Sequence, residues 1–162
     1  MASTLAGASL APRTVLVVDD DAPLRALCRA TLDEAGFRVL EAGDGDEALE
    51  VIGRDRPDLI LLDVMMPRMS GWAVAAELLA EPATGTIPIV FISGRRDPGD
   101  RLRAQELRAS GYVTKPFDPA GLAETVAVVL DEIEHGKREP ALAETLTALK
   151  AEQAHEAKQP RH

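Results

Sequence analysis

The sequence is poor in several features that define whole classes of proteins. It has a single cysteine among 162 residues, which excludes an intrachain disulfide framework and a cysteine-based zinc site. No stretch approaches the ~18 unbroken apolar residues of a membrane-spanning helix. Residues 1–13 lack the basic start that a signal peptide carries before its apolar stretch. We therefore expect a cytoplasmic protein that does not associate with membranes.

Positive charge is also scarce. The chain has 18 lysines and arginines against 27 aspartates and glutamates, a net charge of −9. Residues 14–135 carry 12 basic and 23 acidic residues, a net charge of −11. Nucleic-acid binding needs concentrated positive charge, so we expect no DNA partner. The excess of carboxylates raises the question of whether some of them form a site.

The composition is otherwise that of an ordinary globular domain, with 46% hydrophobic and 28% charged residues. Short apolar runs of strand length alternate with segments of helical spacing. The predicted strands are residues 14–18, 37–41, 59–62, 87–92 and 111–114, and the predicted helices are residues 23–35, 45–54, 71–80, 98–109 and 119–135. This alternation predicts βαβ units and a parallel sheet.

Polar residues follow four of the predicted strands. Sites in parallel sheets form outside the carboxyl ends of the strands, and the residues there are Asp19, Asp20, Asp21, Asp63, Ser93 and Lys115. Two like charges ~4 Å apart repel by about 4 kcal/mol at an effective dielectric of 20. A divalent cation such as Mg²⁺ would relieve this repulsion, because it prefers oxygen ligands. Since aspartate also acts as a nucleophile toward phosphorus, this edge predicts Mg²⁺-assisted phosphoryl chemistry.

Four motifs at this edge carry a resemblance to a known family. They are Val15-Leu16-Val17-Val18-Asp19-Asp20-Asp21, Leu59-Ile60-Leu61-Leu62-Asp63-Val64-Met65-Met66-Pro67-Arg68-Met69-Ser70-Gly71, Pro88-Ile89-Val90-Phe91-Ile92-Ser93-Gly94 and Gly111-Tyr112-Val113-Thr114-Lys115-Pro116-Phe117. In this order and spacing they resemble the receiver domains of two-component response regulators, over residues 14–135. The resemblance implies an α/β, flavodoxin-like (βα)5 fold, which is a doubly wound five-stranded parallel sheet.

The resemblance also implies a role for each polar residue at this edge. Asp63 matches the phosphoacceptor, and Lys115 matches the lysine that contacts the phosphoryl group. Asp20 matches the residue that binds Mg²⁺ (or Mn²⁺) directly, together with Asp63 and the backbone carbonyl of Met65. Asp19 matches a neighbour that binds the metal through water.

Two further matches imply a conformational switch. Ser93 matches the Ser/Thr whose hydroxyl moves to a phosphate oxygen, and Tyr112 matches the aromatic residue that turns inward behind it. A contact that exists only when phosphate is bound can shift a two-state equilibrium. The family also implies a cis peptide bond between Lys115 and Pro116, whereas Asp21 has no family role and is a candidate helix cap.

We expect three segments: a disordered tail (1–13), a receiver domain (14–135), and a linker with a C-terminal helix (136–162). The resemblance implies a histidine kinase or phosphotransfer protein as phosphodonor. Because only 27 residues follow the receiver domain, we expect a stand-alone regulator whose output is contact with another protein. Residues 94–115 carry six basic and three acidic residues, so the face from the fourth to the fifth helix is the expected output surface. The extra helix also allows for a homodimer.

Two alternative functions stay open from the residues. A phospho-independent, receiver-like scaffold would lack some of the acidic or lysine positions, and none is missing. A phosphohydrolase with an aspartate nucleophile would normally have a second aspartate two residues later, where this chain has Met65. Taken singly, the residues of the edge also have simpler interpretations as helix caps or solvated side chains. Cys28 and Trp72 are expected to be packing residues.

Overall fold

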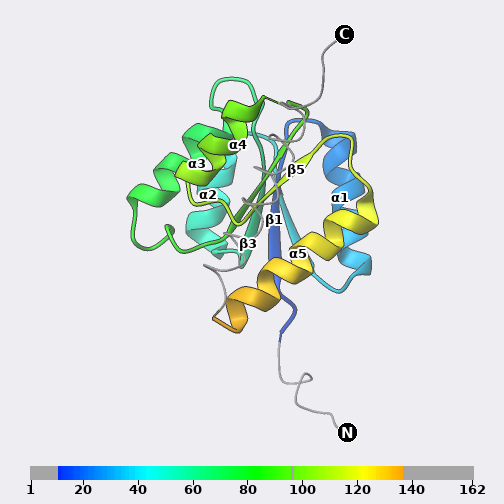
Figure 1. Cartoon of the computed structure of the whole chain (residues 1–162). Helices are drawn as coiled ribbons and strands as arrows, with labels where there is room; N and C mark the ends of the chain where they lie inside the picture. The colour runs from blue at the N-terminus through cyan, green and yellow to red at the C-terminus, as the bar shows by residue number, and fades with distance from the viewer. Residues whose placement is uncertain (1–10, 96, 137–162) are drawn as a thin grey trace, which may run out of the picture.

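The computed structural model describes residues 11–95 and 97–136. Strands and helices alternate through this part of the chain (Figure 1). Their bounds are β1 (Thr14–Val18), α1 (Ala22–Glu34), β2 (Arg38–Ala42), α2 (Gly45–Asp55), β3 (Leu59–Asp63), α3 (Gly71–Ala80), β4 (Ile89–Ser93), α4 (Pro98–Glu106), β5 (Gly111–Thr114) and α5 (Pro119–Glu134).

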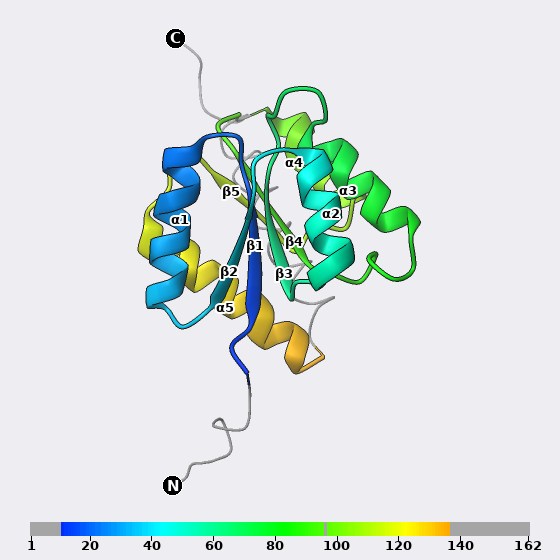
Figure 2. The ribbon, with the colours of Figure 1, turned by 180° about the vertical axis from the view of Figure 1, so that it is seen from behind.

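All the strand pairs are parallel, and the strand order is β2-β1-β3-β4-β5. Helices α1 and α5 cover one face of the sheet, while α2, α3 and α4 cover the other (Figures 1 and 2). The chain therefore has the flavodoxin-like α/β fold that the resemblance implied. Strand β2 lies on one side of β1, whereas β3, β4 and β5 follow on the other side. Ligands of such sheets bind outside the carboxyl ends of the strands at this switch point between β1 and β3.

Each face of the sheet has its own hydrophobic core. In β1, Leu16 and Val18 pack with the residues under α2, α3 and α4, and Val15 and Val17 pack with the residues under α1 and α5. Successive side chains of a strand point to opposite faces, so an apolar run without alternation is needed where both faces are covered. This double burial explains why the predicted strands read as unbroken apolar runs.

Several predicted boundaries differ from those observed, in most cases by one or two residues. The second strand begins at Arg38 instead of residue 37 and ends at Ala42. The fourth strand begins at Ile89, because Pro88 has no backbone N–H to donate to the sheet. Helix α4 ends at Glu106, three residues early, because Arg108 has a left-handed backbone (φ 59°) that a helix cannot continue.

Side-chain caps start several helices immediately after the strand-end loops. The Asp21 carboxylate accepts a hydrogen bond from Leu24 N, which confirms the predicted cap, and the Ser70 hydroxyl accepts one from Ala73 N. Such caps satisfy backbone N–H groups that have no partner inside the helix. They also fix where α1 and α3 begin, next to the residues that follow β1 and β3.

The two ends of the described chain meet. Arg13, which we assigned to the N-terminal tail, forms an ion pair with Glu134 at the end of α5, with Nη2 and Oε2 2.7 Å apart. The predicted C-terminal helix lies outside the described residues, as do residues 1–10 of the predicted tail. Among residues 11–95 and 97–136, no helix has the length and apolar character needed to cross a membrane.

Candidate functional site

The strand register brings the four motifs together at the carboxyl edge of the sheet. Val18 pairs with Leu62, so the residues that follow them in the chain, Asp19 and Asp63, become neighbours. Asp63 pairs with Ile92, and the next residue along β4 is Ser93. The pairing between β4 and β5 then places Lys115, whose backbone N donates to the carbonyl of Ser93 at 2.8 Å, beside them.

Three carboxylates cluster at this edge. Asp19, Asp20 and Asp63 each offer an oxygen, and these oxygens lie within 4.8 Å of one another. Asp19 and Asp63 are each only 2% exposed, whereas Asp20 faces solvent. Buried carboxylates this close together repel each other strongly. The cluster is open on its Asp20 side, where a cation or a phosphoryl group can approach.

Lys115 neutralises part of this charge. Its ammonium donates hydrogen bonds to Oδ2 of Asp19 at 3.1 Å and to Oδ1 of Asp63 at 3.3 Å. Burial lowers the pKa of Lys115, but its hydrogen bonds and the charges of the two aspartates outweigh burial, and the pKa is raised. Lys115 is therefore a permanent cation between the two buried acids.

Asp63 remains poorly stabilised as an anion in spite of Lys115. Burial, reinforced by the charge of Asp19, raises the pKa of Asp63 to about 6. Lys115 and the backbone N–H of Met65, 3.4 Å from Oδ1, act in the opposite direction but do not cancel that effect. A further cation at the site would favour the ionised form of Asp63.

Ser93 is fully buried at the end of β4. Its hydroxyl oxygen accepts a hydrogen bond from the backbone N of Arg95 at 3.0 Å. Within the described residues, no acceptor is found for the hydroxyl hydrogen. The Arg95 side chain forms an ion pair with Asp100 in α4, with Nε and Oδ2 2.8 Å apart, and its Nη1 lies 3.9 Å from the sulfur of Met65. The loop after β4 is thus tied to both α4 and the loop after β3.

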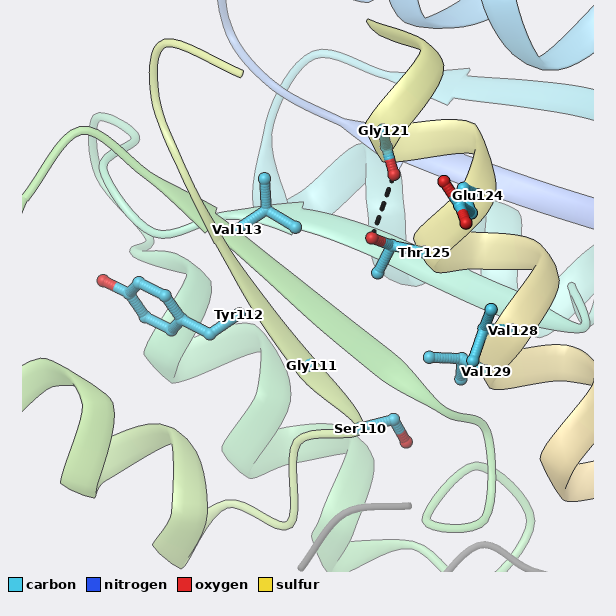
Figure 3. Close-up of a pocket in the computed structure, with 9 residues that line it drawn as sticks. All are labelled: Ser110, Gly111, Tyr112, Val113, Gly121, Glu124, Thr125, Val128 and Val129. Carbon is cyan, nitrogen blue, oxygen red and sulfur yellow. Dashed lines mark hydrogen bonds between the residues drawn. The ribbon is translucent and has the colours of Figure 1, made fainter. Parts of the chain in front are cut away.

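Tyr112 is buried on the α4 side of β5. Its ring extends away from α5, on the other side of the strand from Thr125 and Val128 (Figure 3). The hydroxyl is buried without a hydrogen-bond partner in the described part of the chain. Burial raises the pKa of Tyr112; Ser93 lies close enough to offset part of that shift, but the two hydroxyls do not meet hydrogen-bond geometry.

The loop after β3 packs tightly against the phosphoacceptor candidate. The side chain of Met65 is exposed, and the backbone N of Gly71 donates to the carbonyl of Val64 at 2.9 Å. A Cβ atom at Gly71 would lie 2.3 Å from the carbonyl oxygen of Asp63. Only glycine allows α3 to begin this close to the end of β3.

Two residues singled out in the sequence are structural, as expected. Cys28 is 2% exposed in the core under α1 and α5. Trp72 is buried at the start of α3, where its ring centroid lies 4.6 Å from that of Phe91 and Arg103 packs over it at 5.4 Å. The Lys115–Pro116 bond is cis, as the resemblance implied.

One contact of the site escaped sequence analysis. Arg25, in α1, donates a hydrogen bond to the backbone carbonyl of Asp19. In the sequence Arg25 is one of many charged residues on the solvent side of an amphipathic helix. Its position six residues after Asp19 is a weak indication, because it identifies neither the atom contacted nor the direction of the side chain.

A separate hollow lies between β5 and α5. It has a volume of about 370 Å³ and is lined by Ser110, Gly111, Tyr112, Val113, Gly121, Glu124, Thr125, Val128 and Val129 (Figure 3). The Ser110 hydroxyl is buried there without a partner among the described residues, and Thr125 donates to the carbonyl of Gly121 at 3.0 Å. None of the clustered carboxylates lines this hollow, so it is distinct from the acidic site.

Comparison with known proteins agrees with this geometry. Residues 15–127 match the model of the response regulator receiver domain. The chain is 40% identical over 121 residues to the phosphate regulon transcriptional regulatory protein PhoB of Escherichia coli, covering 75% of this chain and 53% of PhoB. It is 37% identical over 120 residues to the probable transcriptional regulator ycf27 of Porphyridium aerugineum, covering 74% of this chain and 49% of that protein. The chain thus spans about half the length of the curated relatives it matches.

Solved structures match over their whole length. The chemotaxis protein CheY4 of Vibrio cholerae superposes with a TM-score of 0.70 at 33% identity, covering 74% of this chain and 99% of that one. A putative response regulator from Chloroflexus aurantiacus superposes with a TM-score of 0.71 at 32% identity, covering 75% of this chain and 99% of that one. Asp19, Asp20 and Asp63 form an acidic triad that is typical of the Mg²⁺ sites of such domains. The chain therefore belongs to the response regulator receiver domains of two-component systems. These domains are signalling phosphoacceptors rather than catalytic enzymes, and they imply a cognate histidine kinase.

Proposed function

We propose that this chain is a phosphorylation-dependent switch in which Asp63 accepts a phosphoryl group from a histidine kinase or a phosphotransfer protein. The observation that carries the proposal is the cluster of Asp19, Asp20 and Asp63, in which the Lys115 ammonium bridges Asp19 and Asp63. Structural ion pairs alone would not favour two buried acids with one shared cation, because the desolvation of each charge is expensive. A site that receives additional charged groups explains the arrangement.

The transfer requires little covalent help from the protein. A carboxylate oxygen of Asp63 attacks phosphorus, the bond from phosphorus to the donor's histidine nitrogen breaks, and that nitrogen leaves with the bonding pair. Phosphoryl transfer is catalysed mainly by positioning and by neutralising charge on the phosphoryl oxygens. Lys115, which lies 3.3 Å from Oδ1 of Asp63, contributes a positive charge at the reacting carboxylate.

The donor set fits Mg²⁺ or Mn²⁺, because hard divalent cations prefer carboxylate and carbonyl oxygens. We assign Asp20, Asp63 and the backbone carbonyl of Met65 as direct ligands, and Asp19 as a ligand through water. The exposed side of the cluster at Asp20 leaves room for water and phosphoryl oxygens. When bound, the ion supplies charge neutralisation for the carboxylates and the phosphoryl group.

Ser93 and Tyr112 form the switch in this proposal. The Ser93 hydroxyl hydrogen has no acceptor among the described residues, so a phosphoryl oxygen on Asp63 would provide one. That contact exists only in the phosphorylated state and therefore shifts the conformational equilibrium. The hydroxyl of Tyr112 is buried without a hydrogen-bond partner among the described residues. We therefore expect the Tyr112 ring to change position when Ser93 moves.

We further propose that the output is contact with another protein through the face from α4 to α5, or pairing with a second copy. The hollow beside Val128, which is 48% exposed, supports this face as a docking surface. The ion pair between Arg95 and Asp100 already neutralises part of the positive charge of this face. We also propose that the protein is cytoplasmic.

Intact mass spectrometry tests the phosphoacceptor. The protein is incubated with acetyl phosphate and Mg²⁺, and we expect an adduct with the mass of one phosphoryl group that is stable in acid and labile in alkali. Asp63→Asn should lose the adduct, whereas Asp55→Asn, which changes an aspartate that pairs with its neighbour Arg54, should keep it. An absent adduct in the wild type would favour the scaffold alternative, and an adduct in Asp63→Asn would exclude Asp63 as the acceptor.

A further inference from the structure

The backbone of the metal-site motif is bound by a side chain from the following helix. Nη1 of Arg25 donates to the carbonyl oxygen of Asp19 at 2.7 Å. The backbone N of Asp19 continues the sheet by donating to the carbonyl of Ala42 at 3.2 Å. The guanidinium therefore satisfies the first carbonyl after β1.

The same guanidinium is anchored to β2. Nε of Arg25 donates to Oε1 of Glu41 at 3.3 Å, and Nη1 of Arg29 donates to the other oxygen, Oε2, at 2.8 Å. Hydrogen bonding to Arg29, followed by that to Arg25, holds the pKa of Glu41 below its usual value. Because the guanidinium is planar and its donors are rigidly spaced, the contact of Nε with Glu41 orients Nη1 toward Asp19.

The peptide that Arg25 holds joins Asp19 to Asp20. The Asp19 side chain is secured independently, because Oδ1 accepts from Asp21 N at 2.9 Å and Oδ2 accepts from Lys115. By contrast, no hydrogen bond or ion pair to the Asp20 carboxylate is found within residues 11–95 and 97–136. The position of that carboxylate depends on the backbone that carries it, and hence on the orientation of the peptide before it.

We propose that Arg25 is a positioning residue for the divalent cation: by holding the carbonyl of Asp19 it aims the Asp20 carboxylate into the cluster. This inference rests on the proposed function, since it assigns a role toward the metal. Groups that orient metal ligands typically change metal affinity by roughly 10–100-fold when they are removed. Arg25 acts through the backbone and does not touch the metal or the phosphoryl group.

Simple electrostatics makes the opposite prediction. Arg25 is a cation at the edge of the acidic cluster, bonded to the backbone of Asp19, so its removal would strengthen the attraction of a divalent cation if only charge mattered. The direction of the change in affinity therefore distinguishes positioning from charge. Arg29 is the matched control, because it binds the same Glu41 carboxylate without contacting Asp19.

The experiment measures Mn²⁺ binding by the loss of the free-ion electron paramagnetic resonance signal, without phosphodonor. For Arg25→Met we expect a dissociation constant raised roughly tenfold, while Arg29→Met stays at the wild-type value. An unchanged or tighter affinity in Arg25→Met would overturn the inference. Equal weakening in both variants would also overturn it, because the cause would then be Glu41 and not the carbonyl of Asp19.

Two further proteins complete the test. Circular dichroism checks folding, and if Arg25→Met does not fold, Arg25→Lys replaces it in the test. Lysine keeps the positive charge but loses the rigid pair of donors. A wild-type Mn²⁺ affinity in Arg25→Lys would then overturn the inference. Asp20→Asn identifies the site. If the wild type binds no better than Asp20→Asn, both the inference and the proposed metal site fail, whereas a normal wild type with an unaffected Arg25→Met removes the inference alone.

Discussion

The ammonium of Lys115 lies 3.3 Å from Oδ1 of Asp63, so a residue that follows β5 neutralises the last residue of β3. These strands are not neighbours in the sheet, since β4 lies between them. The long lysine side chain spans that strand and also reaches Asp19. The charge balance of the site therefore depends on the position of the edge strand.

Replacing Lys115 with methionine should destabilise the metal-free protein. The change leaves Asp19 and Asp63 as buried acids without their shared cation. Removing one partner of a buried pair costs about 3–5 kcal/mol, and because the Lys115 side chain is 27% exposed we expect about 1–3 kcal/mol. Urea unfolding in EDTA measures this loss. Arg54→Met, which removes an exposed cation, should change little, and equal losses in the two variants would contradict the prediction.

Replacing Asp63 with asparagine should stabilise the metal-free protein at pH 7. Burial and the charge of Asp19 raise the folded-state pKa of Asp63 to about 6, above its ordinary value. The folded state then binds a proton more tightly than the unfolded state, so this contribution to stability is full below about pH 4 and is lost as the pH rises through about 6. We expect a gain of roughly 1–2 kcal/mol at pH 7 and less at pH 4. Urea unfolding at both pH values checks this, and an Asp63→Asn variant less stable than the wild type at pH 7 would contradict it.

Gly71 and Gly53 should respond oppositely to alanine. The Cβ of Gly71→Ala would meet the backbone of Asp63 at 2.3 Å, so α3 must shift and we expect a loss of about 2–3 kcal/mol with slower phosphorylation. Gly53 lies exposed in α2 with nothing within 4 Å of a new Cβ, and its replacement should stabilise the protein by about 0.5–1 kcal/mol. Thermal unfolding compares the pair. A neutral Gly71→Ala would show that the start of α3 is not tightly constrained.

Cys28 should be almost unreactive in the folded protein. Burial, with the charge of Asp19, raises the pKa of its thiol from 9.0 to about 11. Since only the thiolate is nucleophilic, we expect alkylation by iodoacetamide at pH 8 to be slowed by at least ~100-fold relative to the urea-unfolded chain. Rapid modification of the native protein would show that the core under α1 opens readily.

The same shift predicts a pH dependence of stability. Between about pH 9 and 11 the unfolded thiol loses its proton while the folded one keeps it, so rising pH favours unfolding. Cys28→Ala removes this group, and its free energy of unfolding should fall less steeply over that range than that of the wild type. Parallel slopes would mean that the thiol does not ionise on unfolding in this window.

Most of the fold was predictable from local patterns. The apolar runs that became β1 and β3 are continuous because both faces of each strand are buried, and the caps at Asp21 and Ser70 rest on contacts three residues apart. The predicted end of α4 was wrong because the backbone conformation there does not follow from the local sequence. Arg108 adopts a left-handed backbone that its residue type does not indicate.

In the candidate site, too, some features follow from the local sequence and others only from tertiary contacts. The sequence set which chemical groups follow each strand, because Asp19, Asp63 and Ser93 adjoin apolar runs that can be recognised alone. Only the tertiary structure decided which of these groups touch: Lys115 crosses β4 to reach Asp63, and Arg25 turns back to the carbonyl of Asp19. Strand order and side-chain direction arise from packing two hydrophobic faces at once, and no local pattern contains that information.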